Sequence, residues 1–548
     1  MDMSPCETQR EGERVIWGGC KTMSERWFDV AISAESSGPP GVGEGRRIGD
    51  IRINDIYMYG KGHLSPMKSE GQTPPAVCAG FDIHYPCYIN PGFRTGIAKG
   101  LHDQKEGYFD PYLKEDLGVV IDRSFQPATE ILIDLLEAGF ACALSISGTV
   151  VELLEAWYPD MLDLLSRAAK HRNVELLGET YYHSVAGQFR NPGEFEAEIL
   201  MHRDLMKDYF SSVPTTFAHT DYPITPATAE VLRDNEIRAA IIEGDSGPAL
   251  DSDPNHVYTY NGLPILITHC NLADDIAVRF SWRDWDRWPL TADRYAEWIS
   301  VSPGECITLF LDYRVFGDTI GAETGILEFL RALPAALSAK GVDSIHPSDA
   351  VTRFSPRCDI GEMVDADNQQ RTILQQSALQ ALEDAGALVV DKKAWRRLLD
   401  TENLRRMAMR STPCGKPYHP TSQQAVHDHF AAFMRVLSDM EERSAPASRS
   451  PRAVLSLRCV PPEKAFHFSS QERPAGYAAH SLQEFVNILE FAPDEVVNYH
   501  LDRGDFTRWI EFVIGDTTLA KKISGISDRN ELRSTIQKRI DSLWKRIR

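Results

Sequence analysis

The chain has 548 residues, of which 43% are hydrophobic, and its formal net charge at pH 7 is −21. This length allows one large domain together with one or two smaller modules. The negative charge disfavours extended contact with nucleic acid or with an anionic membrane surface, so we expect a neutral polymer or a small solute as the partner. The longest charge-free apolar stretch, residues 138–151, is shorter than the roughly 20 residues that span a bilayer.

The first residues and the cysteines predict a cytoplasmic protein. Asp2, Glu7, Arg10 and Glu11 bring charge into the start of the chain, where a signal peptide would carry a basic region and an apolar run. The ten cysteines form no C-x-x-C pair, which is typical of reduced, mostly buried thiols. We therefore do not expect structural zinc. We also expect no cofactor.

Strand and helix patterns alternate after an N-terminal extension. Residues 1–74 mix charge with glycine and proline, which predicts a poorly ordered segment. Strands are predicted at 76–83, 140–146, 174–177, 239–242, 265–268 and 307–311, with a short one ending at Phe217. Helices are predicted at 127–137, 150–157, 160–169, 194–209 and 227–235. This alternation predicts an α/β fold whose mainly parallel strands form an incomplete (β/α)7-type barrel over residues 75–340.

Helical patterns dominate the rest of the chain. Residues 372–385 and 424–440 predict a helical module, spanning 341–442, that packs on the barrel. The Ser-, Pro-, Ala- and Arg-rich composition of residues 444–456 predicts a linker, which we place at 443–475. Ser481 and Glu484 form a capping-box pattern before an apolar-periodic run. A small helical domain is therefore expected at 476–548.

Four polar clusters lie at the ends of predicted strands, where a barrel collects its active-site residues. They are FDIHYP at 81–86, VELLGETYYH at 174–183, FAHTDY at 217–222 and LADDIAVRFS at 272–281. Cleavage of a glycosidic bond requires two carboxyl groups, and Asp221 and Asp275 are the candidates. Trp282, Trp285 and Trp288 follow the fourth cluster, and flat rings bind the apolar faces of sugars. Each residue alone would more often be a cap, turn or core residue, so only the combination indicates a saccharide site.

The clusters resemble the motifs of the α-amylase-like branch of glycoside hydrolase family 57. His84-Tyr85-Pro86 is similar to the family's His-Gln-Pro motif, with Tyr in the middle position. Residues 174–183 are a close match to the second motif, and residues 272–281 match the fourth motif almost throughout. The resemblance covers about residues 76–440.

This resemblance implies an α-glucan or maltooligosaccharide substrate, cleaved or transferred by a retaining mechanism without a metal. It implies that Asp221 is the nucleophile and Asp275 the general acid, with the neighbouring Asp274 left open as an alternative acid. Together with the polar and aromatic residues around them, it implies a substrate-binding set of His84, Glu175, His183, Asp274, Trp282 and Trp285.

Two positions depart from the family pattern. Asp221 stands in the third motif where the family has Glu, and Arg314 stands where the fifth motif, here at residues 311–318, has Glu. Asp is one methylene shorter, and a displacement of about 1 Å can cost about 100-fold in rate. Three outcomes stay open: a shifted backbone that preserves retention, a gap that admits water, or a catalytically silent protein that binds glucan.

A metal-dependent polysaccharide deacetylase is a rival interpretation. Such enzymes also use an Asp at a strand end, but they need several convergent metal ligands. The sequence lacks the His-x-x-x-His spacing that they favour, and His427 and His429 lie in the predicted helical module. The sequence therefore offers no clear ligand set.

Overall fold

The computed structural model describes residues 47–48, 51–52, 73–94, 107–220, 224–244, 254–360, 371–409, 422–471 and 473–547. The chain divides into two units, Met1–Ser65 and Pro66–Arg548. In the first unit, β1 (Arg47–Ile48) pairs antiparallel with β2 (Ile51–Arg52). Almost all of the extension predicted for residues 1–74 lies outside the described residues.

The second unit is built on two four-stranded sheets. Its main strands are β3 (Ala76–Ile83), β4 (Cys142–Ile146), β5 (Val174–Leu177), β6 (Thr216–Ala218), β7 (Ala239–Ile242), β8 (Val257–Tyr260), β9 (Leu263–Ile267) and β10 (Cys306–Asp312). The orders are β10-β3-β4-β5 and β6-β7-β9-β8. Every pair is parallel except β8 with β9. The predicted strands are confirmed, while β8 was not predicted.

Two isolated parallel bridges connect these sheets. Gly178 pairs with Phe217, and Thr268 pairs with Thr308. The Ala218 amide donates to the Gly178 carbonyl at 2.7 Å, and the His269 amide donates to the Thr308 carbonyl at 2.8 Å. Backbone contacts therefore follow one closed order through β3, β4, β5, β6, β7, β9 and β10, which returns to β3.

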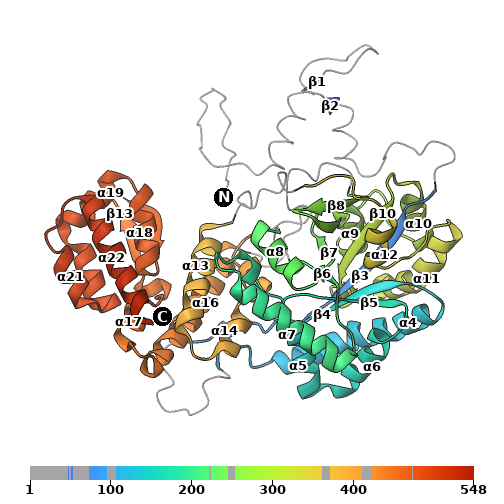
Figure 1. The fold of residues 1–548 in the computed structure, drawn as a ribbon, viewed down its shortest axis with the longest axis horizontal. Coiled ribbons are helices and arrows are strands. Elements are labelled where there is room, and N and C mark those ends of the chain that lie inside the picture. Colours follow the sequence, from blue (N-terminus) through green and yellow to red (C-terminus); the bar gives the residue numbers. More distant parts are fainter. Residues whose placement is uncertain are drawn as a thin grey trace, which may run out of the picture. The chain divides into compact units, whose positions relative to one another are not determined.

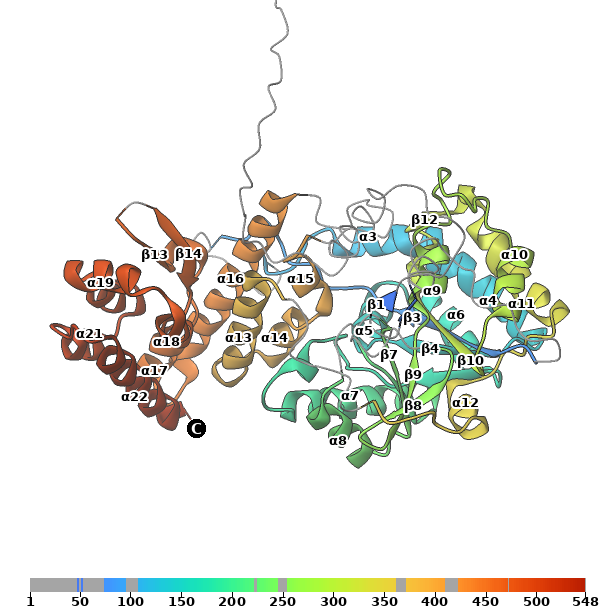
Figure 2. The same ribbon diagram turned by 90° about the horizontal axis from the view of Figure 1, so that it is seen from above.

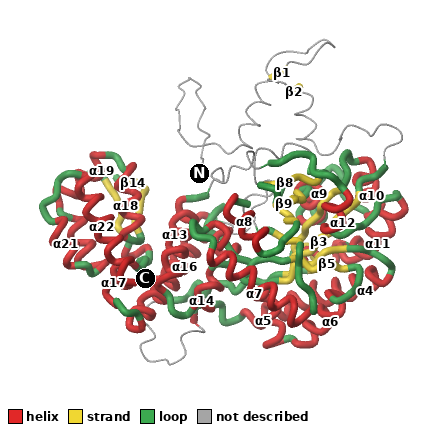
Figure 3. The backbone as a smooth tube through the Cα atoms, in the orientation of Figure 1, coloured by secondary structure: helices red, strands yellow, loops and turns green. Residues whose placement is uncertain are grey.

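Helices surround these strands (Figures 1 and 3). They are α3 (Leu113–Val120), α4 (Gln126–Glu137), α5 (Gly148–Trp157), α6 (Pro159–Ala169), α7 (Gly193–Phe210), α8 (Pro226–Asp234), α9 (Cys270–Ala277), α10 (Ala292–Val301), α11 (Ile326–Ala339) and α12 (Pro347–Arg353). The spacing of buried residues shows why they form: Ala128, Ile131, Leu132 and Leu135 put one apolar face of α4 against the core. Within the described residues, no helix is both long and apolar enough to cross a membrane.

A helical module shares the core of the strands. It consists of α13 (Ile373–Leu388), α14 (Lys392–Leu398), α15 (Thr401–Arg405) and α16 (Gln423–Ser444). Leu382, Trp395 and Phe433 belong to the same cluster of buried side chains as the strand residues Phe81 and Leu144. The module is therefore packed directly against the α/β part of the chain.

The C-terminal part has a core of its own. Its elements are α17 (Pro451–Leu457), β13 (Phe466–Ser469), β14 (Pro474–Ala479), α18 (Leu482–Phe491), α19 (Asp494–Arg503), α20 (Asp505–Trp509), α21 (Thr517–Ile523) and α22 (Arg529–Ile547). Figure 2 shows this part of the chain from a second direction, with all of these elements except α20 labelled. The Ser481 hydroxyl accepts from the Glu484 amide at 3.1 Å, and the Glu484 carboxylate accepts from the His480 amide at 2.6 Å. Ser481 therefore caps α18, as the sequence predicts.

The segment at 443–475, which we expected to be a linker, contains α17 and β13. Ala453, Val454 and Leu457 of α17 are buried. These apolar side chains pack into the core, although the surrounding Ser, Pro and Arg residues dominate the composition of the segment. The segment is therefore structured within the described residues.

Candidate active site

A polar cavity of about 210 Å³ opens at the carboxyl ends of the parallel strands. Asp82 and Asp312 are neighbours in register at the ends of β3 and β10. The lining residues described are Asp82, His84, Pro86, Ser145, Glu179, His183, Ala218, His219, Thr220, Glu243, Phe310, Asp312, Arg314, Thr401, Glu402 and Arg405. This is the edge at which parallel α/β folds place their active sites.

Two stacked histidines lie in this cavity. The rings of His84 and His183 are 4.2 Å apart and inclined by only 11°. His84 Nδ1 lies 2.8 Å from the Ser147 hydroxyl, and its Nε2 lies 3.0 Å from an Asp400 carboxylate oxygen. Since the carboxylate only accepts, we assign the His84 proton to Nε2. This assignment leaves Nδ1 to accept from Ser147.

Local backbone structure fixes both rings. Ser147 is the N-cap of α5, and its hydroxyl accepts from the Val150 amide, so the start of this helix also positions His84. His183 follows β5 in a left-handed conformation with φ of 52°, which is uncommon for a residue with a side chain. Its carbonyl accepts from the Thr401 amide at 3.0 Å. The helical module therefore holds the turn that carries His183.

Glu179 is a buried carboxylate within this network. One oxygen accepts from the Ser145 hydroxyl at 2.9 Å, and the other lies 2.9 Å from His183 Nδ1. Burial alone would raise the pKa of Glu179, but the hydrogen bond and charge of His183 hold that pKa below its usual value. Burial, followed by the charge of His183, lowers the pKa of His84. The network therefore combines an ionised Glu179 carboxylate with a neutral His84 imidazole.

The cavity also carries paired charges. The Arg314 guanidinium donates to Asp312 at 2.6 Å through Nη2. Burial would raise the pKa of Asp312, but Arg314 holds it below its usual value. Arg405 lies 3.7 Å from Glu243 at the end of β7. Arg314, which departs from the fifth motif, is therefore engaged with a carboxylate inside the cavity.

The helical module supplies residues that local sequence patterns did not identify. Thr401, Glu402 and Arg405 line the cavity, and Asp400, only 2% exposed, bonds to His84 across 316 positions of sequence. A strand-end pattern gives no signal for such residues, because α15 is remote in the chain from the strands it completes. Asp82 and Glu179 stand in two of the polar clusters and were identifiable from their positions.

The two predicted catalytic carboxylates do not appear together in the described lining. Asp221 lies outside the described residues. Asp275 is on α9, which follows β9; it is 1% exposed, and its carboxylate accepts from Arg279. The Asp274 side chain is 33% exposed, and one oxygen lies 3.8 Å from Arg279. Asp274 is therefore the more exposed of these two neighbours, and neither is among the described lining residues.

Glu175 lies away from the cavity, contrary to our expectation. Its carboxylate accepts from the Thr216 hydroxyl at 2.5 Å and from the Ser348 amide at 2.9 Å. Glu175 is the second residue of β5, so it stands near the amino end of the strand, whereas Glu179 follows the carboxyl end. Glu179, not Glu175, is the glutamate of this motif that faces the cavity.

The predicted tryptophans also lie outside the described lining. Trp285 packs edge-on against Trp298 with ring centres 6.1 Å apart. Trp282 is half-buried in the loop that follows α9, and its amide donates to the Arg279 carbonyl at 3.0 Å. Of the predicted substrate-binding residues, the structure thus brings His84 and His183 together in the cavity.

Comparison with known proteins identifies the family. Residues 79–361 match the model of Glycosyl hydrolase family 57. The chain belongs to this family. A Methanocaldococcus jannaschii protein named "Putative alpha-amylase" is 35% identical to this family 57 chain over 284 residues, which are 51% of this chain and 60% of that protein. The family resemblance seen in the motifs is confirmed, and the chain spans less than two thirds of that relative.

Solved structures show more distant similarity. The 4-alpha-glucanotransferase of Thermococcus litoralis is 16% identical, with a TM-score of 0.44 over 74% of this chain and 63% of that one. The GH57-type branching enzyme of Pyrococcus horikoshii is 12% identical, with a TM-score of 0.44 over 70% of this chain and 90% of that one. Scores this low carry no argument about the function of this family 57 chain.

Proposed function

We propose that this chain is an α-glucan-active glycoside hydrolase or 4-α-glucanotransferase that acts through two carboxylates with retention of configuration. The observation that carries the proposal is the polar cavity at the carboxyl ends of the strands, with the stacked His84 and His183 inside it. Membership of family 57 and the name of the Methanocaldococcus relative support the α-glucan class. Imidazole and carboxylate groups at such an edge can hold sugar hydroxyls by hydrogen bonds.

In the proposed mechanism, one carboxyl group protonates the glycosidic oxygen while the Asp221 carboxylate attacks the anomeric carbon. The carbon–oxygen bond to the leaving sugar breaks, and a covalent glycosyl ester forms. The first group, now a carboxylate, then takes a proton from water or from a sugar hydroxyl, which attacks the ester and releases Asp221. We assign the acid to Asp274, because its side chain is 33% exposed whereas that of Asp275 is 1% exposed.

The same proposal includes the arrangement of the strands and of the helical module around the site. The closed order of backbone contacts, from β3 around to β10, supports a (β/α)7-type barrel as the scaffold. The core that this scaffold shares with the helical module supports a joint catalytic region. A cytoplasmic location and a maltooligosaccharide partner remain predictions from the sequence.

A catalytically silent glucan-binding protein is the second candidate. The observation that favours it is the pairing of Arg314 with Asp312, since Arg314 replaces a glutamate of the family pattern. The shorter side chain of Asp221 supports the same alternative, because covalent attack depends on near-contact geometry.

The test is incubation of the purified chain with maltoheptaose and with soluble starch, with products resolved by chain length. Wild type should give new shorter or longer glucans, and Asp221→Asn and Asp274→Asn should each abolish them. Asp505→Asn, in the C-terminal part, controls for effects of substitution and purification and should keep wild-type activity. Retention of activity by Asp274→Asn with loss in Asp275→Asn would return the acid role to Asp275. Glucan binding without any product from wild type would establish the silent alternative.

A further inference from the structure

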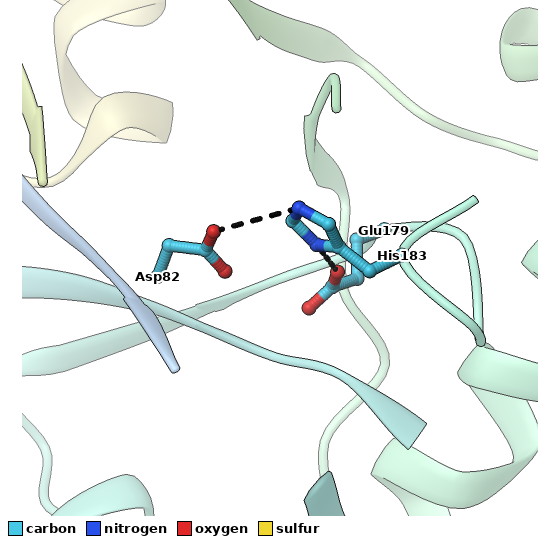
Figure 4. A group of neighbouring side chains, drawn as sticks. All are labelled: Asp82, Glu179 and His183. Atoms are coloured by element: carbon cyan, nitrogen blue, oxygen red, sulfur yellow. Dashed lines mark hydrogen bonds and ion pairs between the residues drawn. The ribbon is translucent and has the colours of Figure 1, made fainter. Parts of the chain in front are cut away.

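Three potential metal ligands converge in the cavity (Figure 4). Asp82 comes from the end of β3, and Glu179 and His183 come from the segment that follows β5. Each offers one ligand atom, and these atoms all lie within 4.8 Å of one another. Their separation in sequence explains why no ligand set was recognisable from local spacing.

The orientation of the His183 ring is suited to coordination. Glu179 accepts from Nδ1 at 2.9 Å, which places the proton there and leaves the Nε2 lone pair directed toward Asp82. In metal sites, a carboxylate that accepts from the ring nitrogen not bound to the metal orients the imidazole and raises its basicity. The ring is held further by its stacking on His84 at 4.2 Å.

The distance between His183 and Asp82 is consistent with a shared ion. His183 Nε2 lies 3.7 Å from an Asp82 oxygen, which is too long for a hydrogen bond. Two ligands of one tetrahedral ion, each about 2.1 Å from it, stand about 3.4 Å apart. A contraction of a few tenths of an ångström would therefore allow both atoms to bind one ion.

The charges of the cavity also favour a cation here. Asp312 is paired with Arg314, Glu243 faces Arg405, and Glu402 accepts from Arg406 at 2.9 Å. Asp82 and Glu179 both approach the His183 ring. A site with two carboxylates and one imidazole therefore has an excess of negative charge in a buried setting, where a divalent cation is strongly attracted.

We propose that Asp82 and His183 bind a divalent transition-metal ion, with Zn²⁺ and Mn²⁺ as the best-suited ions, and that Glu179 supports this site by orienting the His183 ring. Imidazole nitrogen selects such ions over Mg²⁺ and Ca²⁺, and the carboxylates accommodate either Zn²⁺ or Mn²⁺. The cavity leaves room for water or two adjacent sugar hydroxyls as the remaining ligands. This goes beyond the proposed hydrolase function and does not depend on it, because the site is defined by ion binding.

The experiment measures metal content and affinity in the full chain. After removal of any tag and dialysis, elemental analysis should find one Zn²⁺ or Mn²⁺ per chain following reconstitution, and titration calorimetry should give the affinity. Asp82→Asn and His183→Asn should each weaken binding at least about 100-fold, and Glu179→Gln should weaken it about 10–100-fold, as is usual for a supporting carboxylate. Asn suits the left-handed conformation of position 183.

A matched control separates this site from adventitious binding. His500 and Asp505 form another histidine–carboxylate pair at 2.8 Å, outside the cavity, and Asp505→Asn should leave the affinity unchanged. Absence of stoichiometric Zn²⁺ and Mn²⁺ from wild type would overturn the proposal. Unchanged affinity in both folded variants, Asp82→Asn and His183→Asn, would also overturn it. Because activity is not measured, neither result depends on the glucan assay.

Discussion

The two ends of β5 carry glutamates that stand four residues apart in one motif but lie in different surroundings. Glu175, near the amino end, accepts from Thr216 and from the Ser348 amide in the first turn of α12. Glu179, beyond the carboxyl end, contacts Ser145 and His183 in the cavity. One glutamate therefore joins the sheet to α12 at the amino end of β5. The other belongs to the candidate site beyond the carboxyl end of the strand.

The sharpest test of this comparison exchanges each glutamate for its neutral isostere. Glu179→Gln should lower kcat/KM for maltoheptaose by about 100-fold or more, because a buried charged partner of His183 is lost. Glu175→Gln should keep kcat/KM within about 3-fold, since a glutamine oxygen can still accept from Ser348. Steady-state kinetics and melting temperatures of both variants provide the check. Equal losses of activity in two equally stable variants would contradict the comparison.

Asp400 extends the comparison to the helical module. It is the N-cap of α15, accepting from the Glu402 amide at 3.0 Å, and it also binds His84 Nε2. Asp400→Ser keeps a capping hydroxyl but is too short to reach His84. We expect kcat/KM to fall about 10-fold, equivalent to about 1.4 kcal/mol of transition-state stabilisation, with little change in melting temperature.

Asp400→Asn separates positioning from stability. Its side-chain oxygen can replace Oδ1, which caps α15, but its amide nitrogen then stands in place of Oδ2 and cannot accept from His84. Asp400→Asn should therefore keep the wild-type melting temperature and still lose activity, as Asp400→Ser does. A parallel fall of melting temperature and activity in both variants would reduce Asp400 to a structural cap.

The strands were predictable because each is a short apolar run between polar turns. The predicted bounds of β3, β5 and β7 agree with the structure at 76–83, 174–177 and 239–242. Strand β8 was missed, because its alternating aromatic residues in VYTY pair antiparallel at an edge. The expected linker was structured because a few buried apolar side chains decide packing even in a Ser- and Pro-rich segment.

The site was predictable only where residues stand in the segment that follows the carboxyl end of a strand. His84 and His183 met that condition, and both line the cavity. Glu175 did not meet it, because this residue precedes the carboxyl end of β5. Position relative to the strand end would have favoured Glu179 over Glu175 as the site residue. Asp400 could not be identified, because long-range packing brings α15 to His84 and no local pattern records such a contact.

A third glutamate tests whether burial alone, without a cavity, perturbs a carboxyl group. Glu198 on α7 is fully buried and accepts from the Tyr182 amide at 2.9 Å, next to the turn that carries His183. Burial raises its pKa to about 8, far above the ordinary value of about 4.3. The folded chain therefore holds this proton at pH values where the unfolded chain has released it.

The sign of the resulting pH dependence follows from proton linkage. Between about pH 4.3 and pH 8 the folded state binds more protons at Glu198, so stability falls as pH rises through this window. Glu198→Gln keeps a neutral acceptor for the Tyr182 amide and removes that dependence. Between pH 5 and pH 8, the melting temperature of wild type should fall by at least about 2 °C more than that of Glu198→Gln. If the melting temperatures of the two proteins change equally between pH 5 and pH 8, Glu198 is ionised in its buried position. Contacts other than the Tyr182 amide would then compensate for the burial of its charge.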